Sequence, residues 1–140
     1  MNLSEIMTKE LVTCTADETL TQAAKKMGDA NVGSCPVVEG EQLVGLLTDR
    51  DIATRAVAKG LDPSTTKVSQ VMTRDVITGH PQMSIEDACE LLSENQIRRL
   101  PVVEGKKLVG FVALADLAID VDEEEMVAET LHKISMPSKW

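Results

Sequence analysis

The feature that most constrains this chain is an internal repeat with a constant spacing of 65 residues. Residues 36–40, Pro-Val-Val-Glu-Gly, recur at 101–105, and Leu-Val-Gly at 43–45 recurs at 108–110. Between residues 7–53 and 72–118, 14 of 47 aligned positions are identical without a gap. Average residue usage gives about three identities by chance. The sequence therefore predicts two copies of one small unit.

Each copy has the same predicted order of elements. A short extended segment, residues 11–14 or 76–79, leads into a helix that begins after Thr19 or Ser84. Both residues are followed three positions later by a side chain suited to reciprocal capping. Apolar side chains with helical spacing are predicted to face the core in both helices: Leu20, Ala23, Ala24 and Met27, then Ile85, Ala88, Cys89 and Leu92.

Two strands and a second helix complete each copy. Residues 36–39 and 43–47 flank a turn at Gly40, and residues 101–104 and 108–112 flank Gly105. The near-continuous Val and Leu runs predict strands buried on both faces. The second helix is expected to begin near Asp49 in the first copy and near Ala115 in the second. In the first copy, four residues are predicted to point inward: Ile52, Ala53, Ala56 and Val57.

The chain beyond the second copy is predicted to form one more amphipathic helix. It begins with a cap of the form Asp122-x-x-Glu125 and places three apolar residues on one face: Val127, Leu131 and Ile134. The expected fold class is α/β (α+β), a tandem pseudo-twofold repeat of β-α-β-β-α units with a C-terminal helix. The expected parts are residues 1–60, 61–120 and 121–140.

Composition excludes several functions. The net charge is −9, which disfavours nucleic acids and anionic membranes. One Trp, one Phe and no Tyr provide no stacking platform for single-stranded nucleic acid. The N-terminal residues are expected not to form a signal peptide, and no apolar run approaches the roughly 18 residues of a membrane helix. The three cysteines, which are widely spaced, are expected to be buried thiols in a reducing compartment, so the predicted location is the cytoplasm.

Residues 45–51 carry the strongest chemical signal. A strand ends at the hydroxyl of Thr48, a helix begins, and the cation Arg50 and the carboxylate Asp51 follow. A helix start and a hydroxyl suit phosphate oxygens. A carboxylate suits a ribose diol. The alternative interpretation is that Thr48 and Asp51 only cap the helix.

The Gly-x-x-Thr-x-x-Asp element of residues 45–51 recurs at residues 110–116 with Ala113 in place of Thr. Together with the Pro-Val-Val segments, Met-Thr at residues 7–8 and 72–73, and Arg-Arg-Leu-Pro-Val at residues 98–102, it resembles the CBS-domain family from about residue 6 to residue 120. The resemblance implies a stand-alone pair, or Bateman module, with two clefts between the repeats. It implies AMP, ADP or ATP as ligand, or else S-adenosylmethionine or NADH, with no cofactor required. It also implies a homodimer, for which Ile52, Val57 and Ile119 are expected to provide exposed apolar flanks.

The same resemblance implies roles for individual residues. In the first cleft, Asp51 would hold the ribose. Thr48 would hold a phosphate, with Arg50 nearby. The adenine pocket would be lined by Thr13, Val32 and Gly33. The phosphates would be reached by Arg98 and Arg99. The second, weaker cleft has Asp116, Thr78 and Ile97. There, Ala113 and Ala115 stand where the first copy has Thr48 and Arg50, so this cleft lacks a hydroxyl and a cation.

No catalytic constellation is apparent. His80 and His132 lack metal-ligand spacing to the cysteines, so no metal site is predicted. Cys35 precedes Pro36 and is interpreted as a core residue in preference to a redox thiol. Three functions are compatible with a chain of this kind: a nucleotide sensor acting on an unidentified protein target, an assembly module with vestigial sites, and an enzyme. The sensor is favoured because an assembly module has no need of Thr48, Arg50 and Asp51 together.

Overall fold

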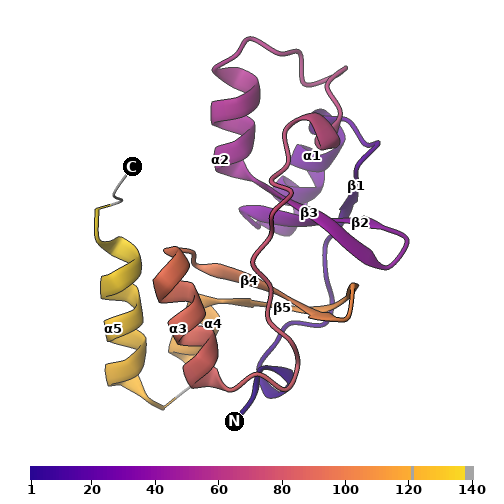
Figure 1. Cartoon of the computed structure of the whole chain (residues 1–140). Helices are drawn as coiled ribbons and strands as arrows, with labels where there is room; N and C mark the ends of the chain where they lie inside the picture. The colour runs from indigo at the N-terminus through magenta and orange to yellow at the C-terminus, as the bar shows by residue number, and fades with distance from the viewer. Residues whose placement is uncertain (121, 138–140) are drawn as a thin grey trace. The chain divides into compact units, whose positions relative to one another are not determined.

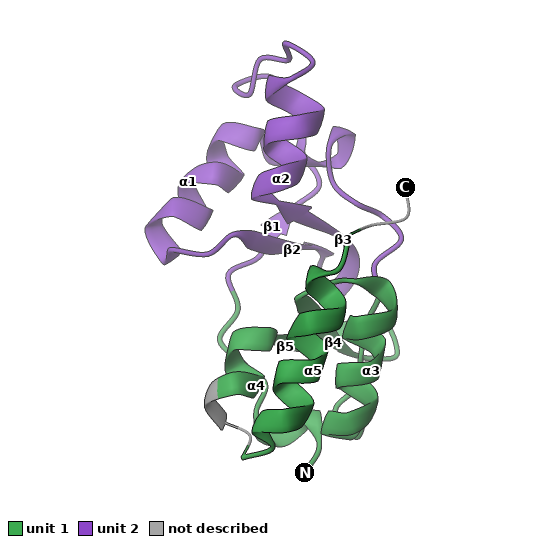
Figure 2. Ribbon diagram, turned by 90° about the vertical axis from the view of Figure 1, so that its left-hand side faces the viewer, with its two compact units in different colours: residues 1–11, 77–140 green, residues 12–76 purple. Residues whose placement is uncertain are grey.

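The computed structural model describes residues 1–120 and 122–137, with the side chains of Ile119 and Asp120 outside the description. Two compact units make up the chain (Figure 2). Unit 1 contains residues 1–11 and 77–140, and unit 2 contains residues 12–76. The mixed α/β architecture of tandem repeats with a C-terminal helix is as predicted.

Unit 2 contains three strands and a set of helical segments (Figure 1). Their bounds are β1 Cys14–Thr15, α1 Leu20–Ala30, β2 Ser34–Glu39, β3 Gln42–Thr48, α2 Asp49–Asp51, the π-helical segment η2 Ile52–Val57 and the 3-10 turn η3 Val68–Gln70. Strand β1 runs parallel to β2, and β2 pairs antiparallel with β3. The first copy thus follows the predicted β-α-β-β-α order.

Helix α1 begins as the sequence predicts. The side chain of Thr19 accepts from Gln22 N, and the side chain of Gln22 accepts from Thr19 N. The helix ends where Asn31 takes a left-handed conformation, with φ of 55°. Leu20, Ala23 and Met27 are buried, but Ala24 is exposed. The prediction for Ala24 was wrong because nothing in unit 2 covers that side of the helix.

The β2–β3 hairpin turns at Gly40, whose φ of +61° is readily adopted only without a Cβ. Five of the six residues of β2 are buried, as predicted for a strand covered on both faces. Strand β3 differs from the prediction, since only Gly45 and Leu47 are buried along it. The register shifts between Val37 and Val38, and the β4–β5 hairpin of unit 1 has the same irregularity between its equivalent residues.

Helix α2 continues directly into η2, where Ala58 N donates to Ala53 O at 2.9 Å. Ala56 is buried and Ile52 is half-buried, as predicted. Ala53 is exposed and Val57 is 69% exposed, so the inward placement predicted for these two was wrong. The physical reason is the wider turn of a π-helix, which moves residues off a stripe spaced for an α-helix.

Unit 1 repeats the plan with an added helix. Its elements are η1 Leu3–Glu5, α3 Ile85–Asn95, β4 Arg99–Glu104, β5 Lys107–Ala113, α4 Leu114–Asp120 and α5 Glu124–Ser135. The equivalent of β1 is a single parallel bridge between Gly79 and Val102. Ser84 caps α3 by accepting from Asp87 N, and Ile85, Ala88, Cys89 and Leu92 are buried as predicted.

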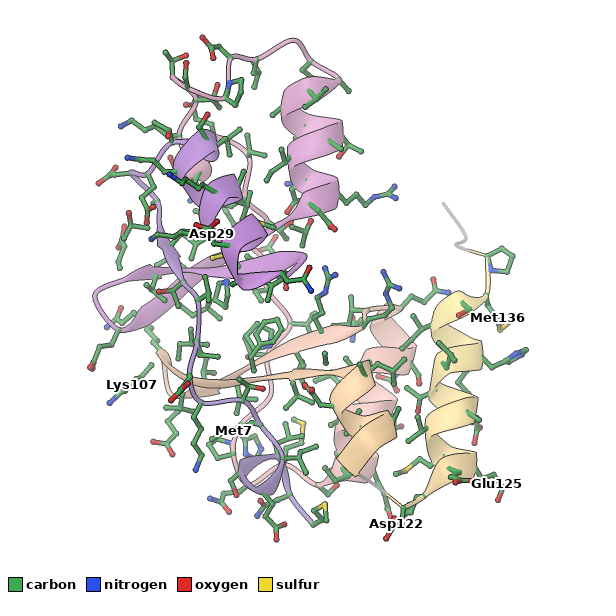
Figure 3. All side chains as sticks on the ribbon, turned by 180° about the vertical axis from the view of Figure 1, so that it is seen from behind. Met7, Asp29, Lys107, Asp122, Glu125 and Met136 are labelled. Atoms are coloured by element: carbon green, nitrogen blue, oxygen red, sulfur yellow. The ribbon has the colours of Figure 1, made fainter. Side chains whose placement is uncertain are left out.

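Helix α5 packs alongside α3 in unit 1 (Figure 2). Gln96, at the end of α3, donates from Nε2 to the carbonyls of Lys133 and Met136, the latter just beyond the last turn of α5 (Figure 3). Two details differ from the prediction. The N-cap is Glu123, without a side-chain cap, in place of Asp122. The buried residue is Thr130, whereas Leu131 is 49% exposed.

The leading segment of each repeat packs with the body of the other repeat. In unit 1, Leu3 N donates to Met83 O at 2.9 Å. In unit 2, at the equivalent positions, Val68 N donates to Glu18 O at 2.9 Å. Each compact unit is therefore assembled from both sequence repeats.

Each unit has its own apolar core. In unit 2, residues of α1 and η2 meet strand residues and Val68, Val71 and Met72. In unit 1, residues of α3 and α4 meet strand residues and Leu3. No helix within the described residues is long and apolar enough to cross a bilayer.

Candidate functional site

The segment that the sequence singled out forms a reciprocal cap at the junction of β3 and α2. Asp51 N donates to the Thr48 hydroxyl at 3.0 Å, and Thr48 N donates to Asp51 Oδ2 at 3.1 Å. The Asp51 side chain is thereby held in a nearly buried position, with the residue 7% exposed. Thr48 and Asp51 therefore do cap the helix, and the cap leaves the carboxylate at the start of α2.

Two further residues of unit 2 contact the Asp51 carboxylate, and the sequence analysis assigned neither to the site. The Thr73 hydroxyl lies 3.4 Å from Oδ1 and 3.3 Å from Oδ2. Arg55 Nε lies 3.8 Å from Oδ1. Arg55 follows Asp51 by four residues, a spacing that places two helical residues on one side. That spacing was a usable signal, whereas the approach of Thr73 depends on tertiary pairing with Leu46.

The other predicted residues of the first site lie around this junction to different extents. Asp49 N donates to Gly33 O at 2.9 Å, so Gly33 is beside the start of α2. Val32 is 41% exposed and Arg50 is exposed, so both are accessible to a ligand. Thr13 is half-buried, and its carbonyl accepts from Lys26 Nζ at 3.2 Å. Hydrogen bonds therefore join Gly33 to the helix start, while Thr13 lies before β1.

The second repeat retains only part of this arrangement. Asp116 is half-buried, and its Oδ2 accepts from Ala113 N at 2.8 Å. Ala113 provides no hydroxyl to complete a reciprocal cap. Thr78 and Ile97 are half-buried, and Ile97 packs against the core of unit 1. The structure thus shows a carboxylate at the equivalent place with less support around it.

Arg98 and Arg99 belong to unit 1. Arg98 is exposed, and its carbonyl accepts from Leu114 N at 2.8 Å. Arg99 begins β4 and is aligned with Ala113 of β5. Their assignment to a phosphate in the first site involves residues of unit 2, so it stays a prediction.

The cysteines behave as core residues. Cys14, Cys35 and Cys89 are free and buried. Hydrogen bonding to the Cys35 thiol, together with burial, raises the pKa of Cys14 well above its ordinary value. Burial likewise raises the pKa of Cys89. A neutral buried thiol is a poor nucleophile. Among the described residues, no group of three or more His, Cys, Asp or Glu side chains is arranged to hold a metal ion.

Surface hollows in unit 1 lie elsewhere. Two of them border α3 and α5, and residues lining both include Ser93 and Lys133. None of the predicted site residues lines either hollow. The chemistry at Asp51 and the shape of these hollows therefore do not coincide, and the polar contacts at Asp51 are the stronger guide to a ligand.

Comparison with known proteins gives a consistent result. The profile described as the CBS domain matches residues 3–58 and again residues 68–123. The CBS domain-containing protein YhcV of Bacillus subtilis is 45% identical over 134 residues, which cover 96% of this chain and 95% of that protein.

Two solved structures are also similar. That of Hypoxic Response Protein I with two coordinated zinc ions has a TM-score of 0.80 and 33% identity, covering 86% of this chain and 99% of that one. The CBS domain pair of protein MJ0100, in complex with 5′-methylthioadenosine and S-adenosyl-L-methionine, has a TM-score of 0.76 and 28% identity, covering 85% and 94%.

Proposed function

Because the chain belongs to the CBS-domain family and consists almost entirely of a tandem pair of these domains, we propose that it is a non-catalytic sensor of an adenine nucleotide. AMP, ADP and ATP are the proposed ligands. The observation that carries the proposal is the nearly buried Asp51 carboxylate, held at the start of α2 beside the Thr48 hydroxyl.

In this proposal each residue of the first repeat has one task. Asp51 accepts hydrogen bonds from the ribose diol. Thr48 and the exposed cation Arg50 contact a phosphate, and Val32 with Gly33 borders the adenine. Related protein MJ0100, crystallised with two adenosyl compounds, supports an adenosine-containing ligand. It also makes S-adenosylmethionine, beside NADH, the main alternative ligand class.

The ligand must share Asp51 with contacts that already exist. A carboxylate has about four lone-pair positions. Thr48 N and the Thr73 hydroxyl occupy Oδ2 at 3.1 and 3.3 Å, while the contacts at Oδ1 are longer, at 3.4 and 3.8 Å. Oδ1 therefore has capacity for a ribose hydroxyl without loss of the helix cap.

An anionic ligand also needs local cations, since the chain carries a net charge of −9. We propose that Arg98 and Arg99 supply them by gripping phosphate oxygens. Replacing both with Ala should then weaken AMP while leaving adenosine binding unchanged. Equal loss of both ligands would show that the two arginines support the fold.

We further propose that the chain forms a homodimer. Val57, 69% exposed at the end of η2, is an apolar side chain that a second copy would cover, and the half-buried Ile52 begins the same segment. The side chain of Ile119, also predicted to contribute, lies outside the described residues. Sedimentation at micromolar concentration tests this, and a clean monomer would refute it. The cytoplasmic location stays a prediction.

A thermal-shift screen tests the proposed ligand. AMP, ADP, ATP, S-adenosylmethionine and NADH are added at equal concentration to the whole chain. A ligand at a hundredfold excess over its Kd stabilises the folded state by about 2.7 kcal/mol. Asp51→Asn, which should weaken binding about tenfold or more, should remove about half of the shift or more, whereas Asp49→Asn, a control at an exposed neighbouring acid, should retain it. If no ligand raises the melting temperature, the assembly-module alternative is favoured.

A further inference from the structure

Arg55 joins the Asp51 carboxylate to a distant part of unit 2. Its Nε lies 3.8 Å from Asp51 Oδ1, while its Nη1 donates to Val71 O at 3.2 Å and to Met72 O at 3.4 Å. The guanidinium therefore lies between the carboxylate and the backbone that leads to Thr73, whose hydroxyl contacts the same carboxylate. Both ends of segment 71–73 are thus connected to Asp51.

The planar guanidinium is well suited to this position. It offers five N–H donors in a rigid fork, so it can satisfy two carbonyls and still face a carboxylate. The Arg55 side chain is 48% exposed and that of Asp51 is 10% exposed. A cation at the edge of a nearly buried acid compensates its charge without covering it completely.

The sequence of the second repeat does not supply the same set of side chains. At the spacing of 65 residues, Asp120 occupies the position of Arg55, and Ala113 that of Thr48. Thr8 corresponds to Thr73, and it pairs with Phe111 through the backbone as Thr73 pairs with Leu46. The cation beside the acid is therefore a property of the first repeat and not of the shared fold.

We propose that Arg55 is a positioning residue that orients the Asp51 carboxylate for a ligand with a ribose diol and thereby sets the selectivity of the first repeat for ribose over deoxyribose. This inference rests on the proposed function, because it assigns Arg55 a part in the same ligand site. Arg55 does not need to touch the ligand. It acts by holding Asp51 Oδ1, the oxygen that Thr48 N does not contact, so that this oxygen keeps an acceptor position for the ligand.

The test compares two ligands that differ by one hydroxyl. Calorimetry measures Kd for adenosine and for 2′-deoxyadenosine with the wild-type chain, Arg55→Ala and Arg55→Gln. Lys59→Ala, which removes an exposed cation just after η2, is the matched control. We expect the Kd of 2′-deoxyadenosine divided by the Kd of adenosine to fall about fivefold in both Arg55 variants. This change lies within the coupling range of residues in one network. The control should keep the wild-type ratio.

The ratio separates positioning from a structural role, because general loosening of the fold weakens both ligands equally. An unchanged ratio in the Arg55 variants would overturn the inference even if both affinities fell. If Arg55→Ala does not fold, Arg55→Gln, which keeps donors for the two carbonyls, decides the question in the same way. If the wild-type chain binds neither adenosine nor AMP, the proposed function itself fails, which is a different result from wild-type binding with an unchanged ratio.

Discussion

In unit 2, strands β1 and β2 each contribute one small buried side chain, Cys14 and Cys35. In unit 1 the equivalent positions hold Gly79 and Leu100. A Cβ placed on Gly79 would lie 2.9 Å from Leu3 Cδ1 and 3.0 Å from Leu100 Cδ2. One backbone plan is therefore filled in two ways, and a large side chain on one strand requires glycine on its neighbour.

The same comparison extends to the surface and to the site. Ala24 on α1 is exposed, whereas its equivalent, Cys89 on α3, is buried in the unit that contains α5. Thr48 and Arg55 surround Asp51 in unit 2, whereas Ala113 alone bonds the side chain of Asp116 among the described residues. Duplication preserved the backbone, while the side chains of each copy took separate roles.

The largest expected effect distinguishes the two cores. Leu100→Ala should lower the free energy of unfolding by about 2–5 kcal/mol, because it leaves a cavity beside Gly79 that no neighbour fills. Cys35→Ala removes one atom at the equivalent place and should cost about 1 kcal/mol. Urea denaturation followed by circular dichroism measures both. Equal losses would show that the two cores are packed alike.

A second comparison concerns the two acids. Replacing Asp51 with Asn should weaken AMP binding about tenfold or more, because a hydrogen bond to a charged group contributes about 1.5–3 kcal/mol. Asp116→Asn should change the dominant binding event little, since alanines, Ala113 and Ala115, stand in the positions of Thr48 and Arg50 in that repeat. Calorimetry on both variants gives affinity and stoichiometry. Two equal sites in the wild-type chain, or occupancy that depends only on Asp116, would contradict the expected inequality.

A third comparison uses glycines within unit 2. A Cβ on Gly45 would lie 2.6 Å from Met72 Sδ and 3.0 Å from the Thr73 carbonyl, so Gly45→Ala should cost about 1–3 kcal/mol. Gly28, in the last turn of α1, has open space around it, so Gly28→Ala should stabilise the chain by about 0.5–1 kcal/mol. Thermal unfolding should show a lower melting temperature for Gly45→Ala and a higher one for Gly28→Ala. A neutral Gly45→Ala would mean that Met72 yields without cost.

The smallest effect concerns an ion pair present in one unit only. Glu18 accepts from Lys26 Nζ at 2.8 Å, and the equivalent positions in unit 1 are Met83 and Leu91. Partial burial opposes ionisation of Glu18, but the hydrogen bonds from Lys26 and Thr15 prevail and lower its pKa.

A lowered pKa in the folded state stabilises the fold above the unfolded value, and that stability is lost as the pH falls through the folded value. Glu18→Gln should therefore cost about 0.2–1 kcal/mol at pH 7, and the difference from wild type should close below about pH 4.5. Urea midpoints from pH 3 to pH 7 test this. A difference that persists at pH 3 would mean that the contact is not electrostatic.

Much of the local structure was predictable because it depends on neighbours in sequence. Thr19 and Ser84 cap helices through residues three positions away, and Gly40 turns a hairpin by its own backbone freedom. Val57 was misplaced because the change from an α-helix to a π-helix is set by packing, which a periodic pattern does not report. Leu131 was misplaced because the face of α5 that is buried depends on α3.

The duplication, the two hairpins, the capped helices and the Thr48–Asp51 pair were thus determined by the sequence itself, since each rests on short-range spacing or on an exact repeat. Tertiary structure alone decided that the leading segment of each repeat packs with the other repeat's body, that Thr73 meets Asp51, and that Arg55 reaches the carbonyls of Val71 and Met72. The physical reason is that these contacts join residues far apart along the chain. Such contacts form only when burial of Met72 and Val71 in the core brings that segment to β3.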